Sequence, residues 1–117
     1  MRRYQDVPAM TRDEAEAFLM NGTEQQLCKT LVSIALHDPD WQWVQARCLH
    51  FARHQSAAVR SVAALSLGHL ARIHRVLDAD AVLPVLHELA RTPDTRGQAE
   101  DALDDIRIFL SAGQEIH

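Results

Sequence analysis

Aromatic residues, lysine and long apolar runs are scarce in this sequence, and these shortages narrow the class of protein. Only 5% of the 117 residues are aromatic, so the core has to be built from Leu, Ala, Val and Ile. A core rich in Ala and Leu favours helices over strands. No stretch approaches the about 20 apolar residues that span a membrane, and the first residues lack the apolar run of a signal peptide. We therefore expect an all-helical, cytoplasmic protein that does not bind membranes.

Motifs for catalysis are also missing. The sequence has no glycine-rich phosphate loop and no Gly-x-Ser-x-Gly, and neither of its two cysteines has a base placed beside it. Cys28 and Cys48 each fall in an amphipathic pattern, which is typical of buried free thiols in a reducing compartment. We predict that the protein is not an enzyme and carries no cofactor or metal.

The charge is mildly acidic. Twelve Lys and Arg residues stand against 16 Asp and Glu residues, which gives a net charge of −4, and Lys29 is the only lysine. A chain without a basic stripe is a poor candidate for binding nucleic acid, because phosphate backbones require clustered cations. The balance favours a basic partner instead.

A repeated pattern of residues indicates how the chain is organised. Arg60 is followed by Ala at +3, Leu at +7 and an aliphatic residue at +10, and Arg96 is followed by the same pattern. The two arginines lie 36 residues apart (96 − 60). A fixed period in this range is typical of stacked helical hairpins, which bury their apolar faces against one another.

Capping and periodicity signals divide the chain further. Thr11 with Glu14, and Thr23 with Gln26, form capping-box patterns that start helices. We expect an N-terminal arm over 1–10, one domain over 11–111 and a tail over 112–117. The six expected helices, which make three antiparallel hairpins, cover about 11–21, 23–37, 41–54, 57–73, 78–91 and 95–111.

Part of the sequence resembles a known repeat family. The segment from Ala58 to Leu70 resembles the second helix of a HEAT repeat, and the segment from Asp94 to Ile106 resembles the next copy. The stretches 38–45, 67–74 and 100–106 are similar to small bacterial HEAT-like proteins that act as immunity proteins beside polymorphic or contact-dependent growth inhibition (CDI) toxins. The resemblance implies a short α-solenoid that binds and neutralises a toxin domain.

One candidate binding face lies on the helix expected over 41–54. Trp43, Arg47, His50 and His54 share a face that differs from the core stripe of this helix. Trp and Arg dominate binding hot spots, but Trp43 would equally fit beneath the neighbouring hairpin. His50 and His54 lie one turn apart, and no third metal ligand is indicated.

The second candidate is an acidic cluster in the last helix, made of Glu100, Asp101, Asp104 and Asp105. Three interpretations stay open: a solvated face, salt bridges to Arg60 or Arg72 of the neighbouring repeat, or a surface for a basic partner. A bridge between repeats is plausible for Asp104 in particular, because it directly follows the core residue Leu103.

The concave surface of a solenoid is formed by the second helix of each hairpin and is the usual binding surface of repeat proteins. We expect His69 and Arg72 to lie on or beside this surface, and the acidic cluster to be the main contact. Trp43, Arg47 and His50 would face the convex side or an edge, with Trp43 as a secondary anchor. We predict a non-catalytic immunity protein that is monomeric until it binds one basic toxin domain, expected to be a nuclease. A scaffold or regulatory adaptor of a cellular enzyme is the alternative, and a lyase-type or metal-dependent activity is a third hypothesis.

Overall fold

The computed structural model describes residues 7–114, with side chains described as far as residue 110, and every regular element in this range is an α-helix. This confirms the predicted all-α class with six helices. The helices are α1 (Arg12–Asn21), α2 (Glu24–His37), α3 (Trp41–Phe51), α4 (Ala57–His74), α5 (Ala79–Ala90) and α6 (Arg96–Gln114).

Both predicted capping boxes are formed. The Thr11 hydroxyl accepts a hydrogen bond from the Glu14 backbone N–H at 3.1 Å, and the Glu14 carboxylate accepts from the Thr11 N–H at 3.0 Å. Thr23 and Gln26 make the same reciprocal pair at the start of α2. These bonds satisfy backbone donors that have no partner inside a helix, which is why short polar residues fix both starting points.

Two helix ends differ from the predicted ones. Helix α3 ends at Phe51, because the chain turns at Ala52 and Arg53, so His54 lies outside it. There the Nδ1 atom of His54 accepts a hydrogen bond from the Ser56 backbone N–H at 3.0 Å. Helix α6 continues to Gln114 instead of ending near residue 111.

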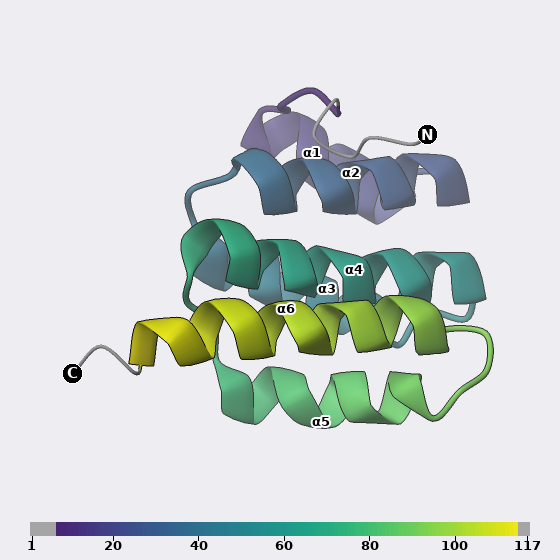
Figure 1. Ribbon diagram of the computed structural model, residues 1–117. Helices are drawn as coiled ribbons and strands as arrows, with labels where there is room; N and C mark the ends of the chain where they lie inside the picture. The colour runs from purple at the N-terminus through teal and green to yellow at the C-terminus, as the bar shows by residue number, and fades with distance from the viewer. Residues whose placement is uncertain (1–6, 115–117) are drawn as a thin grey trace.

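The hairpins stack so that their second helices form one layer. Each first helix packs against its own second helix, and α4 packs against α2 on one side and α6 on the other. Helices α2, α4 and α6 therefore lie side by side, with α4 in the middle; α1 lies behind α2, α3 lies behind α4, and α5 lies beside α6 at the lower edge of the view (Figure 1). We call the outward surface of α2, α4 and α6 the second-helix face. The assignment of the hairpins to HEAT repeats stays a prediction.

The core is built mainly from aliphatic and small side chains. Leu31 of α2, Val44 of α3, Leu67 of α4 and Leu86 of α5 are fully buried, and Ala99 and Ala102 of α6 join them. Each fully buried leucine or valine contributes about 1.5–3 kcal/mol. Small residues set the spacing of α4 and α6: a Cβ atom at Gly68 would lie 3.0 Å from the Cα atom of Ala102.

The chain preceding α1 lies against α2. The Ser33 hydroxyl donates a hydrogen bond to the Pro8 carbonyl at 2.8 Å, and Nε2 of His37 lies 2.7 Å from the Val7 carbonyl oxygen. Both side chains belong to α2, so the described part of the N-terminal arm covers one edge of this helix.

Candidate partner-binding surface

An apolar row runs along the exposed side of α4. The row is made of Ala58, Val62, Leu65 and Ile73, whose spacing places them on one side of the helix. Ile73 is 40% exposed, and Val62 and Leu65 are half-buried. The middle of the second-helix face therefore presents aliphatic side chains.

A hollow of about 550 Å³ separates the apolar row from α2. Ala58 and Val62 line it from α4, and its other lining residues are Val7, Glu24, Gln25, Cys28, Lys29 and Val32. Burial raises the pKa of the Cys28 thiol, and the neighbouring charge of Glu24 raises it further. The thiol is therefore protonated at neutral pH and is a poor nucleophile.

The acidic cluster of α6 divides between two directions. Asp105 faces α4, since a Cβ atom at Gly68 would lie 3.0 Å from its Oδ2 atom. Asp104 precedes it by one residue, a rotation of about 100° around the helix, and therefore points away from α4. By the same geometry Asp101 lies on the side of Asp105, and Glu100 on the side of Asp104. Asp101, Asp104 and Glu100 are exposed.

Asp105 lies among charged groups from both helices. Burial raises the pKa of its carboxyl, the Arg72 guanidinium lowers it, and the charges of Asp101 and Asp104 raise it again. Arg72 is exposed on α4, so it provides a positive charge beside the carboxylates of α6. Asp101, Asp105 and Arg72 thus form a polar margin along one side of the apolar row.

His69 lies beneath this margin. Its side chain is buried, and its Nδ1 atom lies 2.6 Å from an Nη atom of Arg72. Burial lowers the pKa of His69 to about 4, with a further lowering by the charge of Arg72. The imidazole is therefore neutral at pH 7, and Nδ1 accepts a hydrogen bond from Arg72. His69 positions Arg72 and has almost no exposed surface of its own.

The salt bridge to the neighbouring repeat, one of the three interpretations left open for the acidic cluster, is not the one that Asp104 makes. Asp104 pairs with Arg107 in its own helix, with 2.9 Å between Oδ1 and Nη2. Arg60 is also engaged elsewhere: its guanidinium donates to the backbone carbonyls of His54 and Gln55 at 2.8 and 3.0 Å. The physical reason is direction, because Asp104 points away from α4, where both Arg60 and Arg72 are found.

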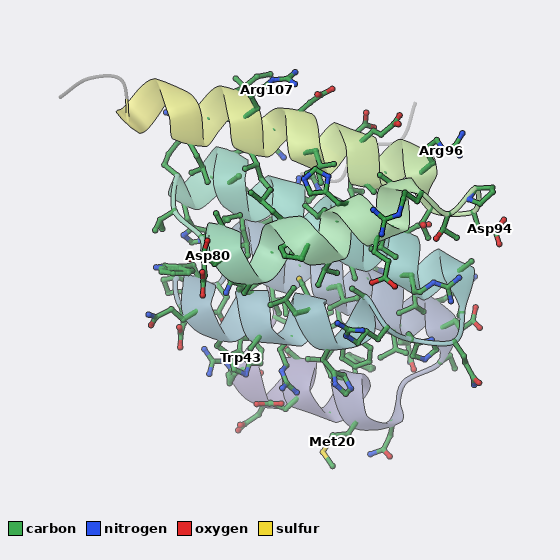
Figure 2. The ribbon with its side chains drawn as sticks, turned by 90° about the horizontal axis from the view of Figure 1, so that it is seen from below. Met20, Trp43, Asp80, Asp94, Arg96 and Arg107 are labelled. Atoms are coloured by element: carbon green, nitrogen blue, oxygen red, sulfur yellow. The ribbon has the colours of Figure 1, made fainter. Side chains whose placement is uncertain are left out.

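Trp43 lies in the layer of first helices and contacts α1. The guanidinium carbon of Arg12 lies 3.8 Å from the centre of the Trp43 ring. Arg12 also pairs with Asp38 at 3.3 Å and with Asp40 at 3.6 Å, on the link before α3. Figure 2 shows Trp43 beside α1 and far from Arg107 of α6. The half-buried indole thus packs against the neighbouring hairpin, as one of the two predicted interpretations holds.

The rest of the face predicted on α3 is divided. Arg47 is half-buried and His50 is exposed, and the His50 ring stands edge-on to Phe51 with 4.8 Å between ring centres. His54 follows the end of α3 at Phe51 and lines the same surface hollow as His50. Within residues 7–110, no three His, Cys, Asp or Glu side chains come together as metal ligands.

Two features of the surface escaped the sequence patterns. The apolar row of α4 was hidden because Val62 reads as part of the core stripe, and only the stacking of α4 between α2 and α6 shows which residues face outward. The contact between Arg12 and Trp43 joins residues far apart in the chain, and no local pattern signals it.

Across the described part of the chain, no helix has both the length and the apolar character needed to cross a membrane.

Comparison with solved structures finds a similar chain in the crystal structure of a CDI complex from Cupriavidus taiwanensis LMG 19424. The two chains are 32% identical and superpose with a TM-score of 0.83, and the match covers 93% of this chain and 98% of that one. No protein-family model and no curated protein matches the chain.

Proposed function

Because this chain belongs to the family of that subunit of the CDI complex, we propose that it is an immunity protein that binds and neutralises a cognate toxin domain. The observation that carries the proposal is the extent of the likeness. At 32% identity over nearly the full length of both chains, the whole fold is shared rather than a single motif. The protein acts by occupying its partner and has no turnover of its own.

The toxin domain binds on the second-helix face. The apolar row of α4 supplies the desolvated centre of the interface, with Ile73 as its exposed large side chain. Asp101, Asp105 and Arg72 supply a charged margin along α6. This arrangement, an apolar centre beside polar groups, is typical of protein interfaces.

The partner is a basic domain, and a nuclease is the class that fits best. Nucleases carry positive charge because their substrate is a polyanion. The carboxylates of Asp101 and Asp105, beside the apolar row of α4, attract such a domain and occupy its substrate cleft. A net charge of −4 on this chain adds a long-range attraction that speeds the encounter.

The decisive experiment uses the toxin domain encoded beside this gene. Expression of the C-terminal domain of a large secreted protein encoded immediately upstream should stop growth, and co-expression of this chain should restore it. The same toxin domain with its active site inactivated should form a one-to-one complex with this chain. Failure both to restore growth and to form a complex removes the proposed function.

A matched pair of variants tests the surface. Ile73 and Met20 are both exposed apolar residues, 40% and 79% exposed, but Ile73 lies on the second-helix face and Met20 lies on α1 (Figure 2). Ile73→Glu should abolish protection because it places a charge in the centre of the interface. Met20→Glu should leave protection intact. Equal protection by both variants would place the toxin elsewhere on the molecule.

The alternative function, a scaffold or regulatory adaptor of a cellular enzyme, makes a different prediction. An adaptor is encoded beside an enzyme of the cell and changes the activity of that enzyme without protecting against any toxin. Purification of this chain with such an enzyme, together with no rescue from the neighbouring toxin domain, would favour the adaptor.

A further inference from the structure

The 36-residue spacing aligns α2, α4 and α6 position by position. Three of these positions lie on one side of each helix, toward the next second helix in the stack. In α2 and α4 all three residues are apolar or small, whereas in α6 all three are charged. The aligned residues are Cys28, Val32 and Ala35 in α2, Ala64, Gly68 and Ala71 in α4, and Glu100, Asp104 and Arg107 in α6.

In α4 these positions receive the next helix. Ala64, Gly68 and Ala71 are buried, and Gly68 touches Ala102 so closely that a Cβ atom would lie 3.0 Å from its backbone. In α2 the equivalent side faces α4, since Val32 lines the hollow that α2 forms with α4. Small residues at these three positions therefore let another hairpin stack.

In α6 the same side faces none of the described helices. Glu100, Asp104 and Arg107 are exposed, and Asp104 and Arg107 hold each other at 2.9 Å. Beside them, α5 and α6 leave an apolar hollow of about 380 Å³, lined by Ala79, Leu83, His87, Leu103, Ile106, Arg107 and Leu110. Leu103 is half-buried here, whereas its counterpart Leu67 in α4 is fully buried.

We propose that Glu100, Asp104 and Arg107 close this end of the stack and keep a second copy of the chain from docking on the α5–α6 hairpin. The apolar hollow between α5 and α6 resembles the surfaces on which hairpins stack inside the molecule. A second copy could dock on it if the charged residues were absent. Burying three charged groups against another copy would remove their hydration, and only Asp104 and Arg107 have each other as partners. Terminal repeats of solenoids need such a polar outer surface to stay soluble.

The opposite end of the stack is closed by a different device. There the described part of the N-terminal arm lies along α2, bonded through Ser33 and His37 to the carbonyls of Pro8 and Val7. A copy that meets the charged end with its own α5–α6 hairpin would form a symmetric dimer through two α5–α6 ends. This symmetric dimer is the association that the charges prevent.

The test is a variant in which all three charges are replaced by a small helix-forming residue, Glu100→Ala with Asp104→Ala and Arg107→Ala. Alanine resembles the small residues of α4 and is the best helix former, so the helix is retained. Sedimentation analysis at micromolar to millimolar concentration should give a dimer that dissociates on dilution, whereas the unchanged protein is a monomer. The control is Asp101→Ala. It raises the net charge by one unit, as the triple variant does, but it lies on the side of α6 that faces the partner.

A fourth substitution locates the contact. Adding Leu83→Glu, in the hollow between α5 and α6, should return the triple variant to a monomer. Four results would overturn the proposal. The folded triple variant could stay monomeric, or the dimer could survive Leu83→Glu. The unchanged protein or Asp101→Ala could also form a dimer. If the triple variant does not fold, the double variant Asp104→Ala with Arg107→Ala applies the same criteria.

Discussion

Asp104 and Asp105 are neighbours in the chain, yet they face different surfaces of the molecule. Asp105 lies against α4, beside Gly68 and within the field of Arg72. Asp104 points away from α4 and is paired with Arg107 at 2.9 Å. A step of one residue along α6 therefore moves the carboxylate from the second-helix face, at Asp105, to the end of the stack, at Asp104.

The first prediction concerns the close approach of α4 and α6. Gly68→Ala should lower the free energy of unfolding by about 1 kcal/mol, because overpacking costs about 1–3 kcal/mol and the better helix propensity of alanine returns part of it. The new Cβ atom would lie 3.0 Å from backbone and cannot be accommodated by a side-chain rotation. Urea unfolding followed by circular dichroism measures the change.

Gly97 provides the control for this substitution. It lies in the first turn of α6, and a Cβ atom there would have no neighbour within 4 Å. Gly97→Ala should therefore be neutral or stabilise the protein, by at most about 1 kcal/mol. Equal effects at the two glycines would mean that α4 and α6 are not in tight contact at Gly68.

The second prediction concerns Trp43. Trp43→Ala should lower the free energy of unfolding by about 2 kcal/mol, because the half-buried ring joins α3 to Arg12 of α1. Trp43→Phe should lose much less, since it keeps an aromatic face for the guanidinium. Binding of the toxin domain should be unaffected by Trp43→Phe. A stable Trp43→Ala variant with faster dissociation from the toxin would instead make Trp43 an anchor of the interface.

The third prediction is a dependence of stability on pH that arises from His69. Its pKa is lowered from 6.5 to about 4 in the folded protein, so between these values the unfolded chain binds more protons. The full stability is present above pH 6.5 and is lost as the pH falls toward 4. Each tenfold difference in proton affinity between the folded and unfolded chains corresponds to about 1.4 kcal/mol, so the loss is on the order of 3 kcal/mol.

Two charged neighbours must be considered in this measurement. The charge of Arg72 contributes to the lowered pKa of His69, after the larger effect of burial. Asp105 acts with the opposite sign, because its own pKa is raised and its protonation at low pH favours the folded state. His69→Gln should flatten the curve between pH 6.5 and 4 and leave the part due to Asp105. An unchanged slope in this variant would contradict the assignment.

The fourth prediction concerns the encounter with the partner. Changing Asp101 and Asp105 to Asn should slow association with the toxin domain roughly tenfold at low salt and flatten its dependence on salt, because charge mainly controls the encounter. Surface plasmon resonance on an inactive toxin domain measures both. The control changes Asp13 and Asp94 to Asn, which removes the same charge from exposed positions elsewhere. Equal association rates for the two double variants would show that only net charge matters.

The helices and the core could be predicted because their causes are local. The capping boxes at Thr11 and Thr23 fixed two helix starts, and helical spacing identified buried residues such as Leu31 and Leu67. The end of α3 was predicted too late, because no glycine or proline marks the turn at Ala52. The helix starts, the buried residues and the end of α3 all depend on interactions between residues that are close in the sequence.

The surfaces depended on how the hairpins stack, which local patterns do not determine. The sequence left the partner of Asp104 open, because only the stacking shows that a rotation of about 100° around α6 turns Asp104 away from α4, toward which Asp105 points. The predicted binding residues on the acidic cluster, His69, Arg72 and α3 remain proposals for the toxin interface. What the structure adds is their direction: His69 supports Arg72 from beneath, and Trp43 packs against α1.

The hollow between α2 and α4 has a practical consequence, because one of its lining residues is Lys29. Lys29 is the only lysine in the sequence and its side chain is exposed. An acylating reagent therefore meets a single ε-amine, and that amine stands at the edge of the proposed interface. Mass spectrometry can measure how far Lys29 is acylated with and without the toxin domain. Lower acylation in the complex would report that the interface is occupied, and no engineered label is needed.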